Sequence, residues 1–216
     1  MNSCITCKEA IEHCMSTHTF AFAHLYGDEK IMDMHIHNCC EVYYSISGGK
    51  QFLIDHCLYD IRPGDLFLIN QFESHHLTQI DQQTHERIIL SIDPEYLSKL
   101  STGVTDLGHC FSFRDTRMPH QIHLSPKEQN RFMYFIHELH DDGGMGEDLL
   151  DQAIFLELMV FLNRAFAARC TDAAAPAQAP SSNYHAQVDA ILSYINSNIG
   201  EPLTLAGLSA HFFMST

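Results

Sequence analysis

Three histidines and one glutamate give the sequence its clearest chemical signal. His35 and His37 are two residues apart, Glu41 follows closely, and His75 ends a second β-rich stretch. On a strand, residues two apart project from the same face, and Glu41 shares this parity. Three imidazoles and a carboxylate suit a divalent transition metal (Zn, Ni, Fe or Mn) with positions open for water or ligand. We therefore predict a metal site formed by His35, His37, Glu41 and His75.

The same region has a second interpretation that needs no metal. In a vestigial metal site, the polar side chains would hold an organic effector or hydrogen-bond to one another. Tyr43 and Ser45 share the parity of Glu41, so on a regular strand they face the same cavity. We predict that Tyr43, Ser45 and His76 bind a small-molecule effector; for Tyr43 the alternative is core packing with a satisfied hydroxyl. No residue is assigned a catalytic role.

Short strands must position these side chains, because β-forming runs alternate with turn residues between positions 17 and 93. Gly48-Gly49 separates two such runs and predicts a hairpin. Phe20 and Phe22 are expected on one face of their strand. Frequent short strands favour a sandwich or barrel over alternating βαβ units. The predicted strands cover residues 18–25, 41–47, 51–55, 66–69 and 86–92.

The pattern changes from strands to helices near Ser125. Ser125-Pro126-Lys127-Glu128 combines a capping serine, proline at the first helical position and glutamate three residues after the cap. A second helix is expected from about Glu147 to Arg169, with a broad apolar stripe. That stripe is wide enough both to cover the strands and to contact a second copy of the chain.

The C-terminal part resembles a linker and the beginning of another unit. Residues 171–182 (TDAAAPAQAPSS) are rich in Ala, Pro and Ser and predict a flexible connection. A third helix is expected over about 186–198, and a fourth begins near Leu203. The sequence stops at Thr216 without a closing element, so we expect further chain beyond this point.

Composition limits the classes of protein that remain. Hydrophobic residues make up 45% and charged residues 18%, as in ordinary globular proteins. No apolar run could cross a bilayer and the N-terminus has no secretory pattern, so a cytoplasmic protein with no membrane partner is expected. The formal charge of −15 provides no basic face for gripping DNA. Cys4, Cys7 and Cys14 lack a complete zinc-ligand set, and buried thiols are expected.

The histidine cluster resembles the two motifs of the cupin family. His35, His37, Glu41 and Gly48 stand at the spacings of the first motif. The second motif begins at Gly64 and reaches its histidine at His75. The usual proline and glycine of that motif are here Asn70 and Phe72, so the second match is degenerate. The resemblance implies a jelly-roll barrel, and the departure weakens the metal prediction more than the fold prediction.

A narrower resemblance is to the sensor domain of AraC-family regulators. It is carried by Glu41-Val42-Tyr43-Tyr44 after the first histidines, by residues 61–70 (IRPGDLFLIN), and by the histidine that follows. Residues 188–198 and 203–215 resemble the helix leading into that family's first helix-turn-helix unit and the beginning of the unit itself. The recognition helix would come next and would enter the major groove of DNA.

The resemblance implies a ligand-sensing and dimerising portion of a bacterial transcription regulator. Its expected divisions are a cupin-like effector-binding barrel (1–124), a helical dimerisation region (125–170), a linker (171–182) and a truncated helix-turn-helix domain (183–216). The expected partners are a small effector such as a sugar, a second copy, and DNA through residues beyond this chain. The alternative is a metal-dependent cupin enzyme, a dioxygenase or isomerase, that uses the same four ligands.

Overall fold

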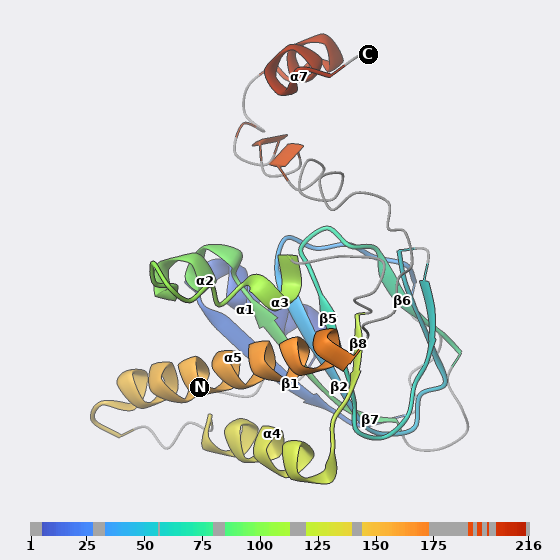
Figure 1. Ribbon diagram of the computed structural model, residues 1–216, viewed down its shortest axis with the longest axis vertical. Helices are drawn as coiled ribbons and strands as arrows, with labels where there is room; N and C mark the ends of the chain where they lie inside the picture. The colour runs from blue at the N-terminus through green and yellow to red at the C-terminus, as the bar shows by residue number, and fades with distance from the viewer. Residues whose placement is uncertain are drawn as a thin grey trace.

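Two antiparallel sheets form the centre of the computed structural model (Figure 1). The structure describes residues 6–27, 33–55, 57–79, 85–112, 120–139, 144–172, 190–191, 194–195, 198 and 202–214. The larger sheet has five strands in the order β1-β7-β2-β5-β8, and the smaller has three in the order β4-β3-β6. This agrees with the predicted class, a cupin-like barrel or sandwich of antiparallel strands followed by helices. The strands are β1 (Phe20–Leu25), β2 (Cys40–Ser47), β3 (Gln51–Ile54), β4 (Cys57–Asp60), β5 (Asp65–Ile69), β6 (His75–Gln79), β7 (Glu86–Ile92) and β8 (Gln121–His123).

Alternation along the strands sorts side chains onto the two faces of the larger sheet. Phe20 and Phe22 pack into one buried cluster, together with residues of the covering helices. Tyr43 and Phe67 pack into another cluster, with Phe52 of the smaller sheet. The second cluster therefore lies between the sheets and the first lies on the outer face, as the two-residue period of a strand requires. The prediction that Phe20 and Phe22 share a face is confirmed.

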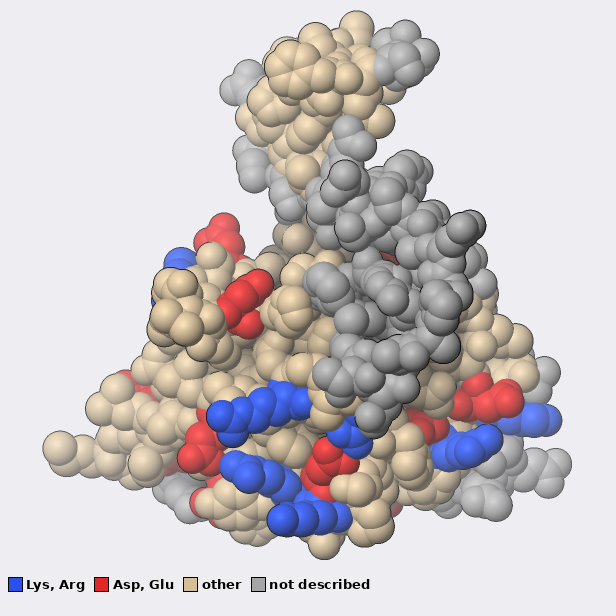
Figure 2. All heavy atoms as spheres, in the orientation of Figure 1, with Lys and Arg blue, Asp and Glu red and all other residues tan. Residues whose placement is uncertain are grey.

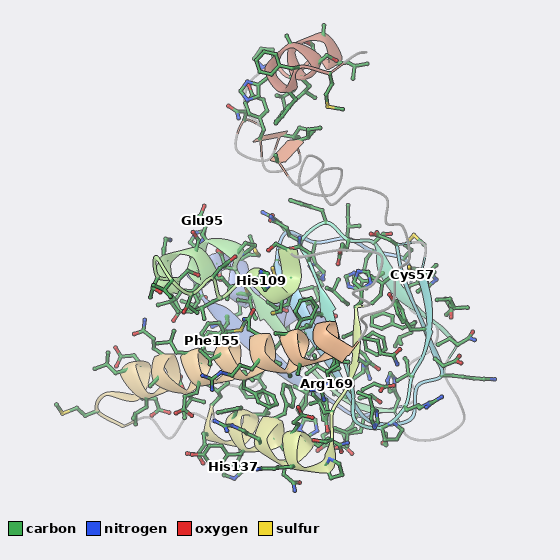
Figure 3. The ribbon with its side chains drawn as sticks, in the orientation of Figure 1. Cys57, Glu95, His109, His137, Phe155 and Arg169 are labelled. Atoms are coloured by element: carbon green, nitrogen blue, oxygen red, sulfur yellow. The ribbon has the colours of Figure 1, made fainter. Side chains whose placement is uncertain are left out.

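Two helices, α4 (Pro126–Glu138) and α5 (Glu147–Asp172), cover the outer face of the larger sheet. The predicted capping box is present, because Glu128 N donates to Ser125 Oγ (3.4 Å) and Ser125 N donates to the Glu128 carboxylate (2.8 Å). The ring of Phe155, which is labelled on α5 in Figure 3, stacks on Phe20 with centroids 4.3 Å apart. One face of the apolar stripe on α5 is thus buried against the sheet.

Three short helices were not predicted: α1 (Cys7–Thr17), α2 (Pro94–Leu100) and α3 (His109–Ser112). Ala10 and Cys14 of α1 are fully buried in the cluster between the sheets. Ala21 and Ala23 of β1 belong to the same cluster, and their small side chains allow the helix to approach closely. The N-terminal helix is therefore part of the sandwich interior.

The predicted hairpin at Gly48-Gly49 is wrong. Strand β2 pairs with β5 and β7, whereas β3 pairs with β4 and β6. Both glycines have positive φ (66° and 74°), a conformation that glycine adopts at little cost. They turn the chain from one sheet into the other, so the two adjacent strands face each other without pairing.

The C-terminal portion is described only in part. The predicted linker falls outside the described residues beyond Asp172, and the helix expected over 186–198 is described only at 190–191, 194–195 and 198. Helix α7 (Leu205–Phe212) is capped at its N-terminus by Thr204, whose hydroxyl accepts a hydrogen bond from Gly207 N (3.1 Å). Within the described part of the chain, no helix is both long and apolar enough to span a membrane.

Candidate functional site

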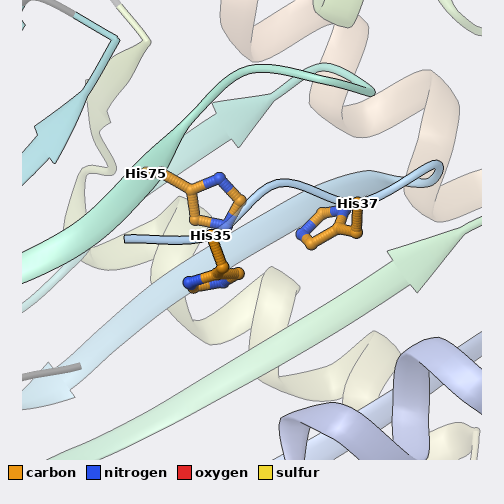
Figure 4. Close-up of side chains that lie close together, drawn as sticks. All are labelled: His35, His37 and His75. Atoms are coloured by element: carbon orange, nitrogen blue, oxygen red, sulfur yellow. The ribbon is translucent and has the colours of Figure 1, made fainter. Parts of the chain in front are cut away.

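Three histidine side chains converge where the segment before β2 meets the beginning of β6 (Figure 4). His35 and His75 form an isolated antiparallel bridge, in which His35 N donates to His75 O (3.3 Å) and His75 N donates to His35 O (3.1 Å). One ligand nitrogen from each of His35, His37 and His75 lies within 4.8 Å of the others. The fold therefore brings together the three histidines that the sequence analysis selected.

Each of the three imidazoles is oriented by a backbone carbonyl. Nδ1 lies 3.1 Å from Asp33 O in His35, 3.0 Å from Cys39 O in His37 and 2.8 Å from Glu73 O in His75. A carbonyl oxygen can only accept, so Nδ1 must carry the hydrogen in all three rings. In the neutral ring the lone pair is then on Nε2. Metal-binding histidines in proteins are oriented by the same kind of outer hydrogen bond.

Glu41, on β2, supplies a buried negative charge to the cluster. Its side chain is 2% exposed, and Oε2 lies 3.1 Å from His37 Nε2 and 3.8 Å from His75 Nε2. Burial opposes the charged form, but the hydrogen bond with His37 and the nearby charge of His75 outweigh it and hold the pKa of Glu41 well below its usual range. Glu41 is therefore ionised and faces the two imidazoles.

The glutamate changes the protonation of the histidines in turn. Burial lowers the pKa of His37, but its contacts with Cys39 and Glu41 prevail and raise that pKa to about 10. Burial likewise opposes protonation of His75, and Glu41 raises its pKa above the ordinary value. Burial lowers the pKa of His35. In the metal-free protein, the charge of Glu41 is thus balanced by protonated imidazole.

The donor set fits a divalent transition metal. Three imidazoles and one carboxylate are nitrogen and oxygen ligands that Zn, Ni, Fe and Mn accept. Nε2 of His75 is buried and has no hydrogen-bond partner among the described residues. A buried polar atom without a partner is costly, and a bound cation would relieve that cost.

The predicted effector-binding residues lie in two different places. Tyr43 and Ser45 are 1% and 0% exposed and share the inner face of β2 with Glu41. Tyr43 Oη lies 2.6 Å from His85 Nε2, whereas Ser45 Oγ has no hydrogen-bond partner among the described residues. His76 alternates with buried His75 and so lies on the opposite face of β6.

Strand β7 contributes two further polar residues to the interior that the sequence analysis missed. Arg87 pairs across the ladder with Ser45 and is 1% exposed, and Ser91 pairs with Glu41 and is fully buried. The hydroxyl of Ser91 also has no hydrogen-bond partner in the described part of the chain. The sequence of this strand, ERIILSI, could have indicated these residues, because Arg87 and Ser91 are each two positions from buried Ile89 and so share its face.

Two cysteines connect the cluster to α1. Cys39 Sγ lies 3.3 Å from His37 Nδ1. Its hydrogen bond with the Cys14 thiol, reinforced by burial, raises the pKa of Cys39. Cys14 is a buried thiol of α1, and Cys4 lies outside the described residues. Cys14 belongs to the buried cluster between the sheets, and its contact with Cys39 links α1 to the histidine cluster.

A groove of about 820 Å³ lies between α4 and α5, away from the histidine cluster. Lys and Arg side chains gather over this face of the molecule, with Asp and Glu between them (Figure 2). Arg169, at the end of α5, donates to both Glu128 oxygens (2.8 and 2.6 Å), which holds the pKa of Glu128 at about 2 (Figure 3). The groove is lined by Ser125, Lys127, Glu128, Arg131, Leu156, Glu157, Val160, Phe161, Arg164, Ala165 and Arg169.

Comparison with known proteins identifies the family of this architecture. Residues 19–159 match the model of the AraC-like ligand binding domain. The chain is similar to the structure of ToxT from Vibrio cholerae, with a TM-score of 0.55, 12% identity, and coverage of 91% of this chain and 72% of that one. The AraC-like transcriptional activator CuxR gives a TM-score of 0.46 and 15% identity over 83% of this chain and 58% of that one. Oxalate decarboxylase from Bacillus subtilis gives a TM-score of 0.32 and 21% identity, with coverage of 35% of this chain and 21% of that one. No curated protein sequence matches the chain.

Proposed function

Because the chain belongs to the family of AraC-like ligand-binding domains, we propose that it senses a small-molecule effector between its two sheets as part of a cytoplasmic bacterial regulator. The observation that carries this proposal is a set of buried polar atoms without partners among the described residues. Ser45 Oγ, Ser91 Oγ and His75 Nε2 are all of this kind. Such atoms are rare in native interiors, and a ligand or ordered water commonly satisfies them.

The arrangement of these atoms suits a small polar effector. Ser45 and Ser91 lie on the adjacent strands β2 and β7, opposite Arg87 and Glu41 respectively. About four residues of strand separate the two pairs, or roughly 13 Å at the rise of a β-strand. Tyr43 lies between them on an otherwise apolar wall. A few polar groups on apolar walls are the usual composition of a ligand pocket.

A calorimetric screen of sugars and other small metabolites tests this assignment. For any compound that binds, Ser45→Ala is expected to weaken affinity about tenfold, the effect of losing one hydrogen bond of about 1.4 kcal/mol. Ser98→Ala, at an exposed serine of α2, is the matched control and should leave affinity unchanged. Unchanged affinity in both Ser45→Ala and Tyr43→Phe would place the effector outside the space between the two sheets.

We further propose that His35, His37, Glu41 and His75 hold a divalent transition metal within this pocket. A metal there supplies a Lewis-acid centre for an oxygen-bearing effector group. The chain's own contribution is the carbonyl-oriented imidazoles and the buried carboxylate. Elemental analysis after purification without chelator or histidine tag is expected to find one metal ion per chain, and metal-free protein would count against the site.

Dimerisation through the exposed side of α5 is the third part of the proposal. Leu149 and Leu150, in its first turns, are 65% and 67% exposed. The helix opens with Glu147 and Asp148, whereas Arg164 lines the groove near its other end. In an antiparallel pair, the acidic end of each helix would lie against the basic groove of its partner.

A charge exchange tests this contact by sedimentation at micromolar concentration. Arg164→Glu should weaken the dimer, and adding Asp148→Arg should restore it, because the two changes exchange the signs of one interface pair. Lys99→Glu, at an exposed lysine of α2, is the control and should have no effect. A monomeric native protein, or no recovery in the double variant, would contradict an antiparallel α5 contact.

In the complete protein, effector binding would alter the dimer and so the engagement of DNA by helix-turn-helix units. Such coupling requires different effector affinities in the two arrangements. The second candidate is a metal-dependent dioxygenase or isomerase, and the histidine cluster itself favours it. The two proposals differ in one readout: effector turnover by the metal-loaded chain would favour the enzyme, and effector recovered unchanged with altered DNA affinity would favour the regulator.

A further inference from the structure

The turn between β5 and β6, residues 70–73, contacts both segments that carry the histidine cluster. Phe72 N donates to His37 O (2.9 Å). Glu73 O accepts the hydrogen bond from His75 Nδ1 (2.8 Å). A single short turn therefore fixes the backbone at His37 and the ring orientation of His75.

This turn is held by its own hydrogen bonds in a strained conformation. Asn70 N donates to Glu73 Oε2 (2.7 Å), Gln71 N donates to Asn70 Oδ1 (2.9 Å), and Glu73 N donates to Asn70 O (3.3 Å). Phe72 has φ of 63°, in the left-handed region that aromatic residues rarely adopt. Asn70 and Phe72 are the positions at which the second cupin motif is degenerate. Strain of this kind persists only where surrounding contacts enforce it.

His120, which lies outside the turn, contacts it through the side chain of Glu73. Its Nε2 lies 3.2 Å from Glu73 Oε2, at ion-pair distance though without good hydrogen-bond alignment. Its Nδ1 lies 2.8 Å from Tyr59 Oη, and its backbone carbonyl accepts from Leu68 N (2.9 Å). His120 is 8% exposed and directly precedes β8, which leads into α4. Through Glu73, contacts thus run continuously from His75 to the strand that precedes the helices.

We propose that Glu73 and His120 are positioning residues for the metal ligand His75. His120 fixes the Glu73 side chain, which fixes the turn and so the carbonyl that holds the His75 ring. The inference rests on the proposed metal site, because it concerns how one of its ligands is oriented. Loss of an outer hydrogen-bonded partner typically weakens metal binding 10- to 100-fold. His120 acts one residue farther out, so the lower end of that range, about tenfold, is expected.

Zn²⁺ affinity, measured by competition with a chromophoric chelator, tests the proposal on the untagged chain. His120→Phe keeps a ring but removes both nitrogens, and should weaken Zn²⁺ binding about tenfold. His120→Gln retains a polar group toward Glu73 and should recover most of the affinity. His123→Gln is the matched control, since His123 is exposed and pairs with Asp65, and it should bind as the native chain does.

The effect must disappear when the ligand through which it acts is removed. In a His75→Ala background, His120→Phe should cause no additional loss of affinity, whereas a general structural defect would persist there. An unchanged affinity in His120→Phe, or an equal loss in both backgrounds, would overturn the proposal. If His120→Phe does not fold, Glu73→Gln is used in its place with the same expected result.

A second readout separates this inference from the metal proposal. If the native chain binds no Zn²⁺, the metal site is refuted, and the orientation of His75 is still measurable by NMR. The hydrogen-bonded Nδ1–H of His75 should give a slowly exchanging resonance in the native chain, and His120→Phe should lose it. Retention of that resonance would show that His120 does not position the ring.

Discussion

The pH dependence of metal affinity follows from the proton that a metal must displace at His37. The pKa of His37 is about 10, because contacts with Cys39 and Glu41 outweigh burial. A raised pKa keeps the ring protonated below that pH, so binding must release this proton. Because pH 7 lies about three units below this pKa, removing the proton from His37 at pH 7 costs about 4 kcal/mol, at 1.36 kcal/mol per unit. The apparent affinity at pH 7 is thus expected to be roughly a thousandfold below its limiting value.

The assay is a Zn²⁺ titration by chelator competition at several pH values between 7 and 9. The native chain should gain at least about tenfold in affinity per pH unit, since His75 also has a raised pKa. Glu41→Gln removes a major cause of the raised pKa of His37, so its affinity should be weaker overall and depend less on pH above 7. A pH-independent affinity in the native chain would refute this electrostatic account of the cluster.

Three further predictions concern the stability of the helical layer and are tested by urea unfolding. Ser125→Ala removes the capping hydroxyl of α4 and should cost about 1 kcal/mol, and no loss would contradict the capping box. Arg169→Met should cost about 1 kcal/mol at pH 7, discounted from the pKa shift because the pair is partly exposed. Because the pKa of Glu128 is lowered, the stability contributed by its ion pair with Arg169 is complete above pH 4.5 and is lost as the pH falls toward 2. An equal cost of Arg169→Met at pH 7 and at pH 3 would refute this contribution. Phe155→Ala should cost about 3–5 kcal/mol, because the ring is fully buried against Phe20, and a cost below about 1 kcal/mol would contradict that packing.

Local chemistry predicted the elements whose signals are contained in a few neighbouring residues. The cap at Ser125 and the shared face of Phe20 and Phe22 depend on residues within one turn or strand, and both were confirmed. The hairpin at Gly48-Gly49 failed because glycine permits a positive φ without specifying which strands then pair. Strand partners are chosen by long-range packing, which these two glycines do not encode.

The residues of the candidate site likewise divide into those with a local sequence signal and those placed by long-range packing. The spacing of His35, His37 and Glu41 selected residues that the structure places together, although only Glu41 lies on β2 and the two histidines precede that strand. Ser91 and Arg87 were missed because their role depends on pairing with β2, far away in the sequence. The contact of His120 with Glu73 joins segments that no local pattern connects.

A crystal structure of the chain, with anomalous scattering collected at several metal absorption edges, would show whether the four ligands hold a metal and whether the space between the sheets holds an effector. We expect one metal peak bounded by His35, His37, Glu41 and His75, and residual density for effector or water beside Ser45 and Ser91. No anomalous peak at the histidines, with Ser45 and Ser91 instead hydrogen-bonded to other protein groups, would contradict this expectation.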